Sequence, residues 1–316
     1  MQRQQLLKNI REVLAKAGFY ISEIYSTHLT GFDIIARRDE MLLIIKVLTN
    51  VDSLSENVAN ELMKLSSLLR GSPILIGEKN GSGSLEDDVV YFRFGIYTIT
   101  ISTLKNYLLE GIPITIYAAP GGLYANLDQE KLQQLRKEKN ISLGTFARNV
   151  KISRKTVQMY EEGMNAKVEV AIKIEELLES PITLPINLFR INKSDTKKSQ
   201  TYEDGVRNIK EFQREIFSLL ENVGYRIFPM NRCPFEALSK EKEKIILTSV
   251  QESNRKLIQK AQIMSSISKI TEKYAVVFTD KTSSKTNVKG TPLIYRKELK
   301  KIRHPEEVFE LIVERA

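Results

Sequence analysis

One pattern of helical and strand-like segments occurs twice in this chain of 316 residues, and the repeat constrains the fold more than any other feature. In the first copy, apolar residues at helical spacing in 6–14 lead to a helix stop at Gly18, and three strand-like runs follow within 19–48. A helical stretch over 57–71 and a strand-like run at 72–79 complete this copy. Because helices and strands mix in one segment, each copy predicts an α/β unit.

The second copy lies within 205–281 and keeps the order and the spacing of the first. FQREIFSLLENVGYRIF (212–228) parallels LLKNIREVLAKAGFYIS (6–22), and FEALSKEKEKIILTSV (235–250) aligns without a gap with FDIIARRDEMLLIIKV (32–47). Then AQIMSSISKITEKYAVVFTDK (261–281) parallels ELMKLSSLLRGSPILIGEK (61–79). Three matches in the same order predict a duplicated domain.

The stretch between the two copies has a different pattern of residues. Its Pro-Gly-Gly turn at 120–122, between two short extended stretches, predicts a hairpin, and the pattern is helical from 128 to about 188. The polar run NKSDTKKSQTYEDG (192–205) has the composition of a flexible linker. We therefore predict an α/β domain at 1–126, a helical domain at 127–190, a linker at 191–204 and a second α/β domain at 205–316.

Within the helical domain, the sequence predicts a short helix, a tight turn and a second short helix. Ser142 can cap the first helix, and Ser153, after the turn NVKIS, can cap the second. Val157 and Tyr160 are three residues apart, so both would face inward on the second helix, which ends at Gly163. This is the helix-turn-helix arrangement.

The module resembles the Cro/CI family of helix-turn-helix domains over about 55 residues. The matching positions are Leu135, Arg136, Ser142, Ala147, Ile152, Ser153, Thr156, Val157, Tyr160, Glu161 and Gly163. The resemblance implies a domain that binds double-stranded DNA. Many members carry a glutamine at the start of the second family helix, where this chain has Leu143, and this departure affects one DNA contact and not the fold.

Charge in the module supports a DNA partner. Residues 131–163 contain eight cations and three anions, so this segment carries +5 of the chain's net charge of +9. Arginine and glutamine on the second helix of the motif can make bidentate contacts to bases, while flanking cations bind phosphates. The candidate DNA-binding residues are Ser142, Arg148, Lys151, Ser153, Arg154, Lys155, Thr156 and Gln158. The alternative is a helical bundle with a merely solvated basic face.

The first α/β unit resembles the metal-dependent nucleases of the PD-(D/E)xK type, including archaeal Holliday-junction resolvases. Asp33 matches the metal-binding aspartate and Lys46 the lysine, but Ile44 stands at the second acid, and Asn9 at the glutamate of the helix. One carboxylate cannot hold Mg²⁺ as two do. We therefore interpret Asp33 and Lys46 as a vestigial nuclease site or a simple salt bridge.

The second copy departs further from the nuclease pattern. Glu236, Leu247 and Ser249 stand at the positions of the aspartate, the second acid and the lysine. An active nuclease is therefore not the expected function of either copy.

Several classes of protein and site are disfavoured by composition. Cys233 is the single cysteine, and the two histidines, His28 and His304, have no metal-ligand spacing around them. The chain has no glycine-rich phosphate loop, no nucleophile-base pairing and no cofactor motif. No apolar run is long enough for a membrane span, and no signal peptide is evident. We expect a cytoplasmic protein without catalytic activity, metal or cofactor.

The order of the segments, taken over nearly the whole chain, resembles an archaeal family of helix-turn-helix transcriptional regulators. The expected fold is α/β plus all-α, with two restriction-endonuclease-like α/β domains flanking a Cro/CI-type bundle. The expected function is a transcription regulator that binds double-stranded DNA as a homodimer, with the flanking domains serving dimerisation or accessory contacts. The alternatives are a bridging protein associated with RNA polymerase or other transcription machinery, and a structure-selective nuclease or junction binder.

Overall fold

The computed structural model describes residues 2–22, 31–189, 210–252, 256–280 and 285–316. His28, part of the first predicted strand and the predicted linker at 191–204 lie outside these ranges. The chain divides into two compact units, one made of 1–13, 48–53 and 74–190 and the other of 14–47, 54–73 and 191–316. None of the helices in the described ranges has the length and apolar character that a membrane crossing requires.

The first α/β repeat has the element order that the sequence predicted. The elements are helix α1 (Arg3–Lys16), strands β1 (Tyr20–Ile21), β2 (Ile34–Arg38) and β3 (Met41–Asn50), helix α2 (Glu56–Leu69) and strand β4 (Ser72–Asn80). The central residues of β3, from Leu42 to Val47, are all buried. Burial of consecutive residues on both sides of a strand explains why this segment, apart from Lys46, is apolar throughout instead of alternating.

Further short elements extend the first repeat toward the helical domain. They are η1 (Val51–Ser53), β5 (Gly83–Ser84), β6 (Val89–Arg93), β7 (Ile96–Ile99), α3 (Ile101–Lys105), the π-helical turn η2 (Asn106–Glu110), β8 (Ile116–Ala119), β9 (Gly122–Ala125) and β10 (Ala166–Lys167). Among the described residues, the sheet runs β1-β2-β3-β4-β7-β6-β8-β9-β10, with β5 paired to β4. The antiparallel pair β8 and β9 is the predicted Pro-Gly-Gly hairpin.

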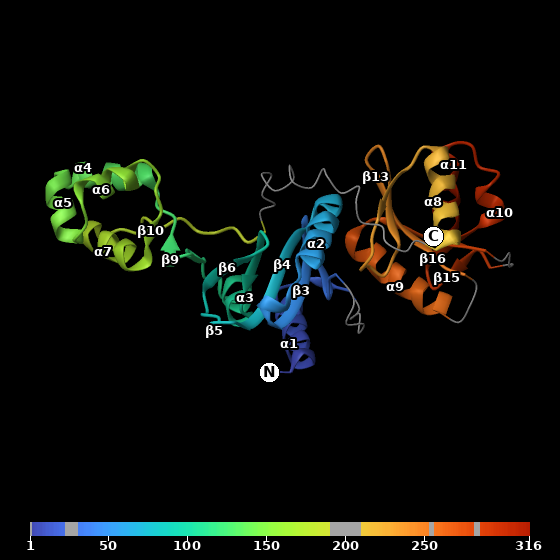
Figure 1. Ribbon diagram of the computed structural model, residues 1–316, viewed down its shortest axis with the longest axis horizontal. Helices are drawn as coiled ribbons and strands as arrows, with labels where there is room; N and C mark the ends of the chain where they lie inside the picture. The colour runs from blue at the N-terminus through green and yellow to red at the C-terminus, as the bar shows by residue number, and fades with distance from the viewer. Residues whose placement is uncertain (1, 23–30, 190–209, 253–255, 281–284) are drawn as a thin grey trace. The chain divides into compact units, whose positions relative to one another are not determined.

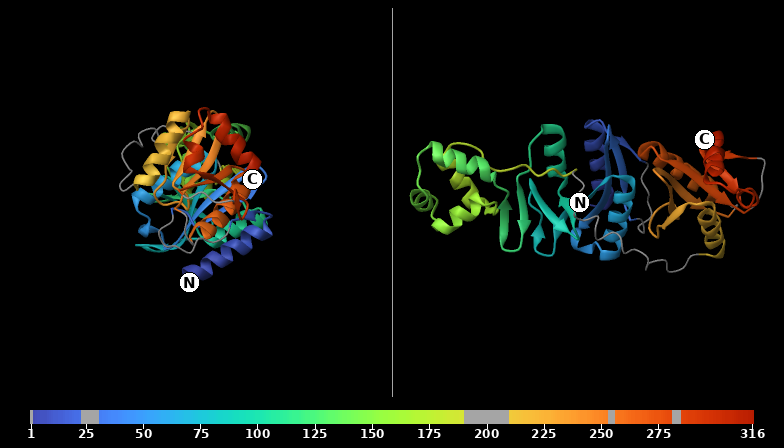
Figure 2. Two further views of the ribbon diagram at one scale, coloured as in Figure 1. Left: turned by 90° about the vertical axis from the view of Figure 1, so that its right-hand side faces the viewer. Right: turned by 90° about the horizontal axis from the view of Figure 1, so that it is seen from above.

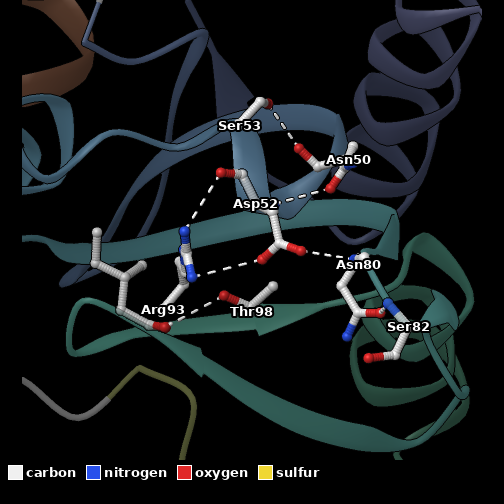
Figure 3. Close-up of polar contacts among 9 residues, drawn as sticks. Asn50, Asp52, Ser53, Asn80, Ser82, Arg93 and Thr98 are labelled. Carbon is white, nitrogen blue, oxygen red and sulfur yellow. Dashed lines mark hydrogen bonds and ion pairs between the residues drawn. The ribbon is translucent and has the colours of Figure 1, made fainter.

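A polar network around Asp52 ties η1 to β6 and to the turn that follows β4 (Figure 3). The Asp52 carboxylate accepts a hydrogen bond of 2.6 Å from the backbone N–H of Gly81 and lies 3.5 Å from the guanidinium of Arg93. The close approach of η1 to β4 requires a glycine at position 77, because a Cβ there would lie 2.2 Å from Cγ1 of Val51. The network therefore fixes the turn between β4 and β5.

The helical domain is a compact bundle that continues from the β8–β9 hairpin (Figures 1 and 2). Its helices are α4 (Gln129–Glu138), α5 (Leu143–Val150), α6 (Arg154–Glu161) and α7 (Val168–Leu178). Apolar side chains from all four helices form one core, which Ala125 of β9 and Ala166 of β10 complete. Because β9 pairs with β10, the sheet and the bundle share this strand pair.

The second α/β repeat also has the predicted order. Its elements are α8 (Glu211–Val223), β11 (Arg226–Pro229), β12 (Ala237–Glu241), β13 (Lys244–Val250), α9 (Lys256–Thr271), β14 (Tyr274–Thr279), β15 (Asn287–Val288), β16 (Thr291–Tyr295), α10 (Arg296–Leu299) and α11 (Pro305–Arg315). The sheet order is β11-β12-β13-β14-β16-β15. Helices α8 and α11 cover one face of this sheet and α9 the other (Figure 1).

Candidate nucleic-acid interface

The predicted capping serines begin the two helices of the helix-turn-helix motif. Ser142 Oγ accepts a hydrogen bond of 3.1 Å from the backbone N–H of Thr145 at the start of α5. Ser153 Oγ accepts one of 3.0 Å from the backbone N–H of Thr156 at the start of α6, and the two hydroxyls lie 2.8 Å apart. Three of the predicted DNA-binding residues, Ser142, Ser153 and Thr156, thus also define where the helices start.

Buried side chains fix which face of α6 points inward. Val157 and Tyr160 are buried in the bundle core, where they meet Phe146, Ala147 and Val150 of α5. Burial also raises the pKa of the Tyr160 hydroxyl. Since residues three apart on a helix share a face, these two anchors set the rotation of α6 about its axis.

The opposite face of α6 carries the predicted base-reading residues. Arg154, Lys155 and Gln158 are all exposed. The Arg154 side chain lies near the first turn of α5. A Cβ built on Gly144 would be 3.9 Å from the Cδ and Nε atoms of Arg154. The structure therefore brings Arg154 close to the α5 terminus that Ser142 caps.

Two further predicted cations lie at the turn between α5 and α6. Arg148 is exposed one helical turn after Gly144, so it lies on the same side of α5. Lys151 is also exposed and adopts the left-handed conformation, with φ of 62° and ψ of 47°. Together with Arg154 and Lys155, these side chains place four cations within eight residues of sequence.

One of the eight cations that the sequence assigned to phosphate binding has a different role. Arg136 and Glu161 form a bidentate ion pair, with Nε–Oε1 and Nη2–Oε2 distances of 2.5 and 3.1 Å, and their side chains are only 11% and 9% exposed. Arg136 also donates to the carbonyl of Ile141 at 3.0 Å. It therefore links α4 to α6 and is not available to DNA. Because Glu161 is neutralised with it, the rest of 131–163 still carries +5.

The end of α6 exposes a residue that the sequence analysis did not select. Met159 is 39% exposed, whereas Met164 packs against the bundle core. Gly163, with φ of 100°, ends the helix, and a Cβ there would lie 2.6 Å from Oε1 of Gln129. The helical spacing from Val157 and Tyr160 places Met159 outside the core, and this signal in the sequence could have selected it.

Asp33 and Lys46 lie together, as the nuclease resemblance implied, but at a buried site in the other compact unit. The Lys46 ammonium is 3.5 Å from the Asp33 carboxylate, which also accepts a 2.7 Å hydrogen bond from the backbone N–H of Val47. The register of β2 and β3 puts Ile44 on the same face as Asp33 and Lys46. An apolar side chain thus stands where a second metal-binding acid is needed.

These residues do not fit a Mg²⁺ site that needs two carboxylate ligands. The one carboxylate, that of Asp33, is already paired with Lys46 and accepts a hydrogen bond from the backbone N–H of Val47. In the described part of the chain, no three His, Cys, Asp or Glu side chains group so that they could hold a metal. His304 is exposed at the start of α11 and has no such group around it within the described residues.

The second repeat has a carboxylate with a similar backbone contact. Glu236 accepts a 2.8 Å hydrogen bond from the backbone N–H of Val250 and one of 3.2 Å from the Ser249 hydroxyl. Its other oxygen pairs with Lys260, which comes from α9 and not from the neighbouring strand. An acid-lysine pair is therefore present in both repeats, although Ser249 stands at the position of the strand lysine.

Models of two protein families match parts of this chain. A PD-(D/E)XK superfamily domain matches residues 3–114, and a helix-turn-helix model matches residues 132–184. The second match contains α5, α6 and the predicted DNA-binding residues. No solved structure matches the chain.

Archaeal proteins are similar to the chain over its whole length. A protein of Methanocella arvoryzae is 37% identical over 315 residues, which cover 100% of this chain and 97% of the relative. Proteins of Methanosarcina barkeri and Natronomonas pharaonis are 36% and 35% identical, again over 100% of this chain and over 98% and 99% of the relatives. Each of the three is named "Putative HTH-type transcriptional regulatory protein".

Proposed function

The chain belongs to this family of archaeal HTH-type transcriptional regulatory proteins, and on that basis we propose that it is a DNA-binding regulator of transcription that reads double-stranded DNA through α6. The observation that carries the proposal is the division of α6 into two faces. Val157 and Tyr160 anchor one face in the core, while Arg154, Lys155 and Gln158 are exposed on the other.

The exposed residues divide into base-reading and phosphate-binding groups. Arg154 and Gln158 can each form two parallel hydrogen bonds to a base edge, a guanine for arginine and an adenine for glutamine. Arg148 and Lys151, at the turn before α6, supply phosphate contacts that hold the module on the duplex. The N-termini of α5 and α6 lie next to these cations and contact the sugar-phosphate backbone of the DNA. The residues at these two capped ends are Ser142, Ser153 and Thr156.

This division predicts different effects for two double variants on a duplex selected by the wild-type protein from a random library. Arg154→Ala with Gln158→Ala should relax sequence preference, at about 1–3 kcal/mol for each lost bidentate contact. Arg148→Ala with Lys151→Gly should weaken binding to the selected duplex and to random duplexes alike. The slope of log affinity against log salt concentration should fall by about one unit for each lost phosphate contact.

Circular dichroism of both double variants checks that the bundle remains folded. Equal affinity of the first variant and the wild type for the selected duplex would show that α6 does not read the bases. Retention of a protein partner from lysate after nuclease treatment would favour the bridging role with the transcription machinery.

The rest of the proposal concerns assembly and chemistry. The protein acts as a homodimer without catalytic activity, metal or cofactor, and the α/β repeats supply the dimer interface or accessory contacts. The match to the PD-(D/E)XK domain makes a structure-selective nuclease the second candidate. Cleavage of branched DNA with Mg²⁺ or Mn²⁺ that is lost in Asp33→Ala would favour it.

A further inference from the structure

Met159 is an apolar side chain in a polar setting on the reading face of α6. Its side chain is 39% exposed, while Val157, two residues before it, and Tyr160, the next residue, are buried. Met164, five residues later, packs against the core of the bundle, and Met159 does not belong to that cluster. Its outward position therefore cannot be explained by packing within the bundle.

Helix geometry places Met159 beside the residues proposed to read bases. It follows Lys155 by four residues, so the two side chains lie one above the other on the same face. It directly follows Gln158, which is also exposed. Any surface that Lys155 and Gln158 approach together is thus also in reach of Met159.

The proposed ligand surface contains one group that matches this side chain. The major groove presents hydrogen-bond donors and acceptors, and its methyl group belongs to thymine. The cations Arg154 and Lys155 at the start of α6 provide the charge complementarity that brings the helix to the polyanion. A flexible thioether suits contact with a small apolar group on a surface that is otherwise polar.

Resting on the proposed function, we propose that Met159 is a specificity-determining residue that contacts the 5-methyl group of a thymine in the major groove. Gln158 pairs best with adenine, so the two successive residues together favour A·T base pairs where the second half of α6 lies. The selected duplex should therefore contain thymine at a fixed position in each half-site.

The test replaces thymine by deoxyuridine, one position at a time, in the duplex that the wild-type protein selects. This substitution removes the methyl group and leaves every base pair intact. Burial of one methyl group contributes enough free energy to change the dissociation constant about fourfold. We expect this loss at one position of the half-site for the wild type, and no loss at that position for Met159→Ala.

Two variants serve as controls. Met159→Leu keeps an apolar side chain of similar size, so it should retain the dependence on the methyl group. Ile172→Ala removes a side chain that is 50% exposed on α7 of the same bundle, and it should behave like the wild type. Because all proteins bind the same pair of duplexes, any effect of the methyl group on DNA shape alone cancels in the comparison.

The outcomes separate this inference from the proposed function. One outcome is that binding to the selected duplex requires Arg154 and Gln158 while deoxyuridine lowers the affinity at none of the thymine positions. In that case the Met159 contact is wrong and the proposed reading of bases by α6 still holds. An equal loss for wild type and Met159→Ala also overturns the contact, since the methyl group then acts without Met159. Failure of the wild type to select any duplex overturns both.

Discussion

At the scale of single residues, Arg136 shows that a cation in a basic segment can belong to the interior. The sequence places it among eight cations between 131 and 163, and nothing in that count distinguishes it from Lys137. In the fold, Arg136 is paired with Glu161 at the far end of α6, while Lys137 is exposed. The buried pair holds α6 against α4 and contributes no charge to the exposed face of α6 that we propose binds DNA.

Removing one partner of this pair should destabilise the protein strongly. We expect Glu161→Ala to lower the free energy of unfolding by about 3–5 kcal/mol, because a buried guanidinium then lacks its counter-charge. Replacement of both residues by leucine should recover much of the loss. Urea-induced unfolding followed by circular dichroism measures both changes.

The matched control for this prediction is Lys137→Ala, which should change stability by no more than about 0.5 kcal/mol. Arg136 and Lys137 should also differ in DNA binding, since Arg136 is buried in an ion pair while Lys137 is exposed. A reduced salt slope for Arg136→Ala with unchanged stability would show that Arg136 is a phosphate contact after all.

Asp33 and Glu236 show that an acidic side chain can have a structural role through a hydrogen bond to the backbone. Each accepts a hydrogen bond from the N–H of a valine on the adjacent strand, Val47 in one repeat and Val250 in the other. A buried backbone N–H without a hydrogen-bond partner costs free energy. Satisfying this N–H is therefore a reason for each repeat to have a carboxylate here that does not require metal binding. The nearby lysines then neutralise the carboxylates.

At the scale of elements, the turn between α5 and α6 combines backbone geometry with charge. Lys151 has a left-handed backbone, a conformation that side chains with a Cβ adopt at a cost. The same residue is one of the exposed cations next to α6. An alanine substitution would therefore remove the charge and leave the strained backbone in place.

Glycine at position 151 separates these two contributions. We expect Lys151→Gly to change the free energy of unfolding by less than about 1 kcal/mol, because relief of strain offsets the greater entropy of the unfolded chain. Its affinity for random duplex should fall, and its salt slope should drop by about one.

Lys151→Val provides the contrast, since a β-branched residue is poorly tolerated with positive φ. It should lose the same phosphate contact and about 1–2 kcal/mol of stability in addition. Thermal or urea unfolding compares the two variants. If glycine proved as destabilising as valine, the turn would not have the left-handed geometry.

At the scale of the whole molecule, one helix-turn-helix module is found among the described residues, and in the sequence it lies between two α/β repeats. Modules of this type read two half-sites separated by about one helical turn of DNA, roughly 34 Å, when two of them act together. One chain of 36.2 kDa can therefore occupy only one half-site. A twofold-symmetric site requires a second chain.

We accordingly expect the protein to show twice the mass of one chain in light scattering. It should also protect two half-sites on one side of the duplex. Inserting about five base pairs between the half-sites turns one to the opposite side and should abolish joint binding, whereas about ten should largely restore it. A monomer mass with an undivided footprint that tolerates either insertion would contradict the homodimer.

The sequence by itself determined the features that depend on neighbouring residues. Ser142 and Ser153 marked the starts of α5 and α6 because capping uses a side chain and an N–H three residues apart. The spacing of Val157 and Tyr160 gave the inward face of α6, and hence the exposure of Arg154, Lys155 and Gln158. The order of elements in both repeats followed from hydrophobic periodicity in the same way.

The tertiary structure decided what depends on residues far apart in the chain. Strand β10 pairs with β9 across about forty residues, Arg136 meets Glu161, and Lys260 reaches Glu236 from a helix. Strands β6 and β7 and helix α3 were not predicted, because segments of four or five residues carry too little periodicity. Such contacts depend on register and on which surfaces pack together, so only the folded chain distinguishes an exposed cation such as Lys155 from one that holds two helices together, such as Arg136.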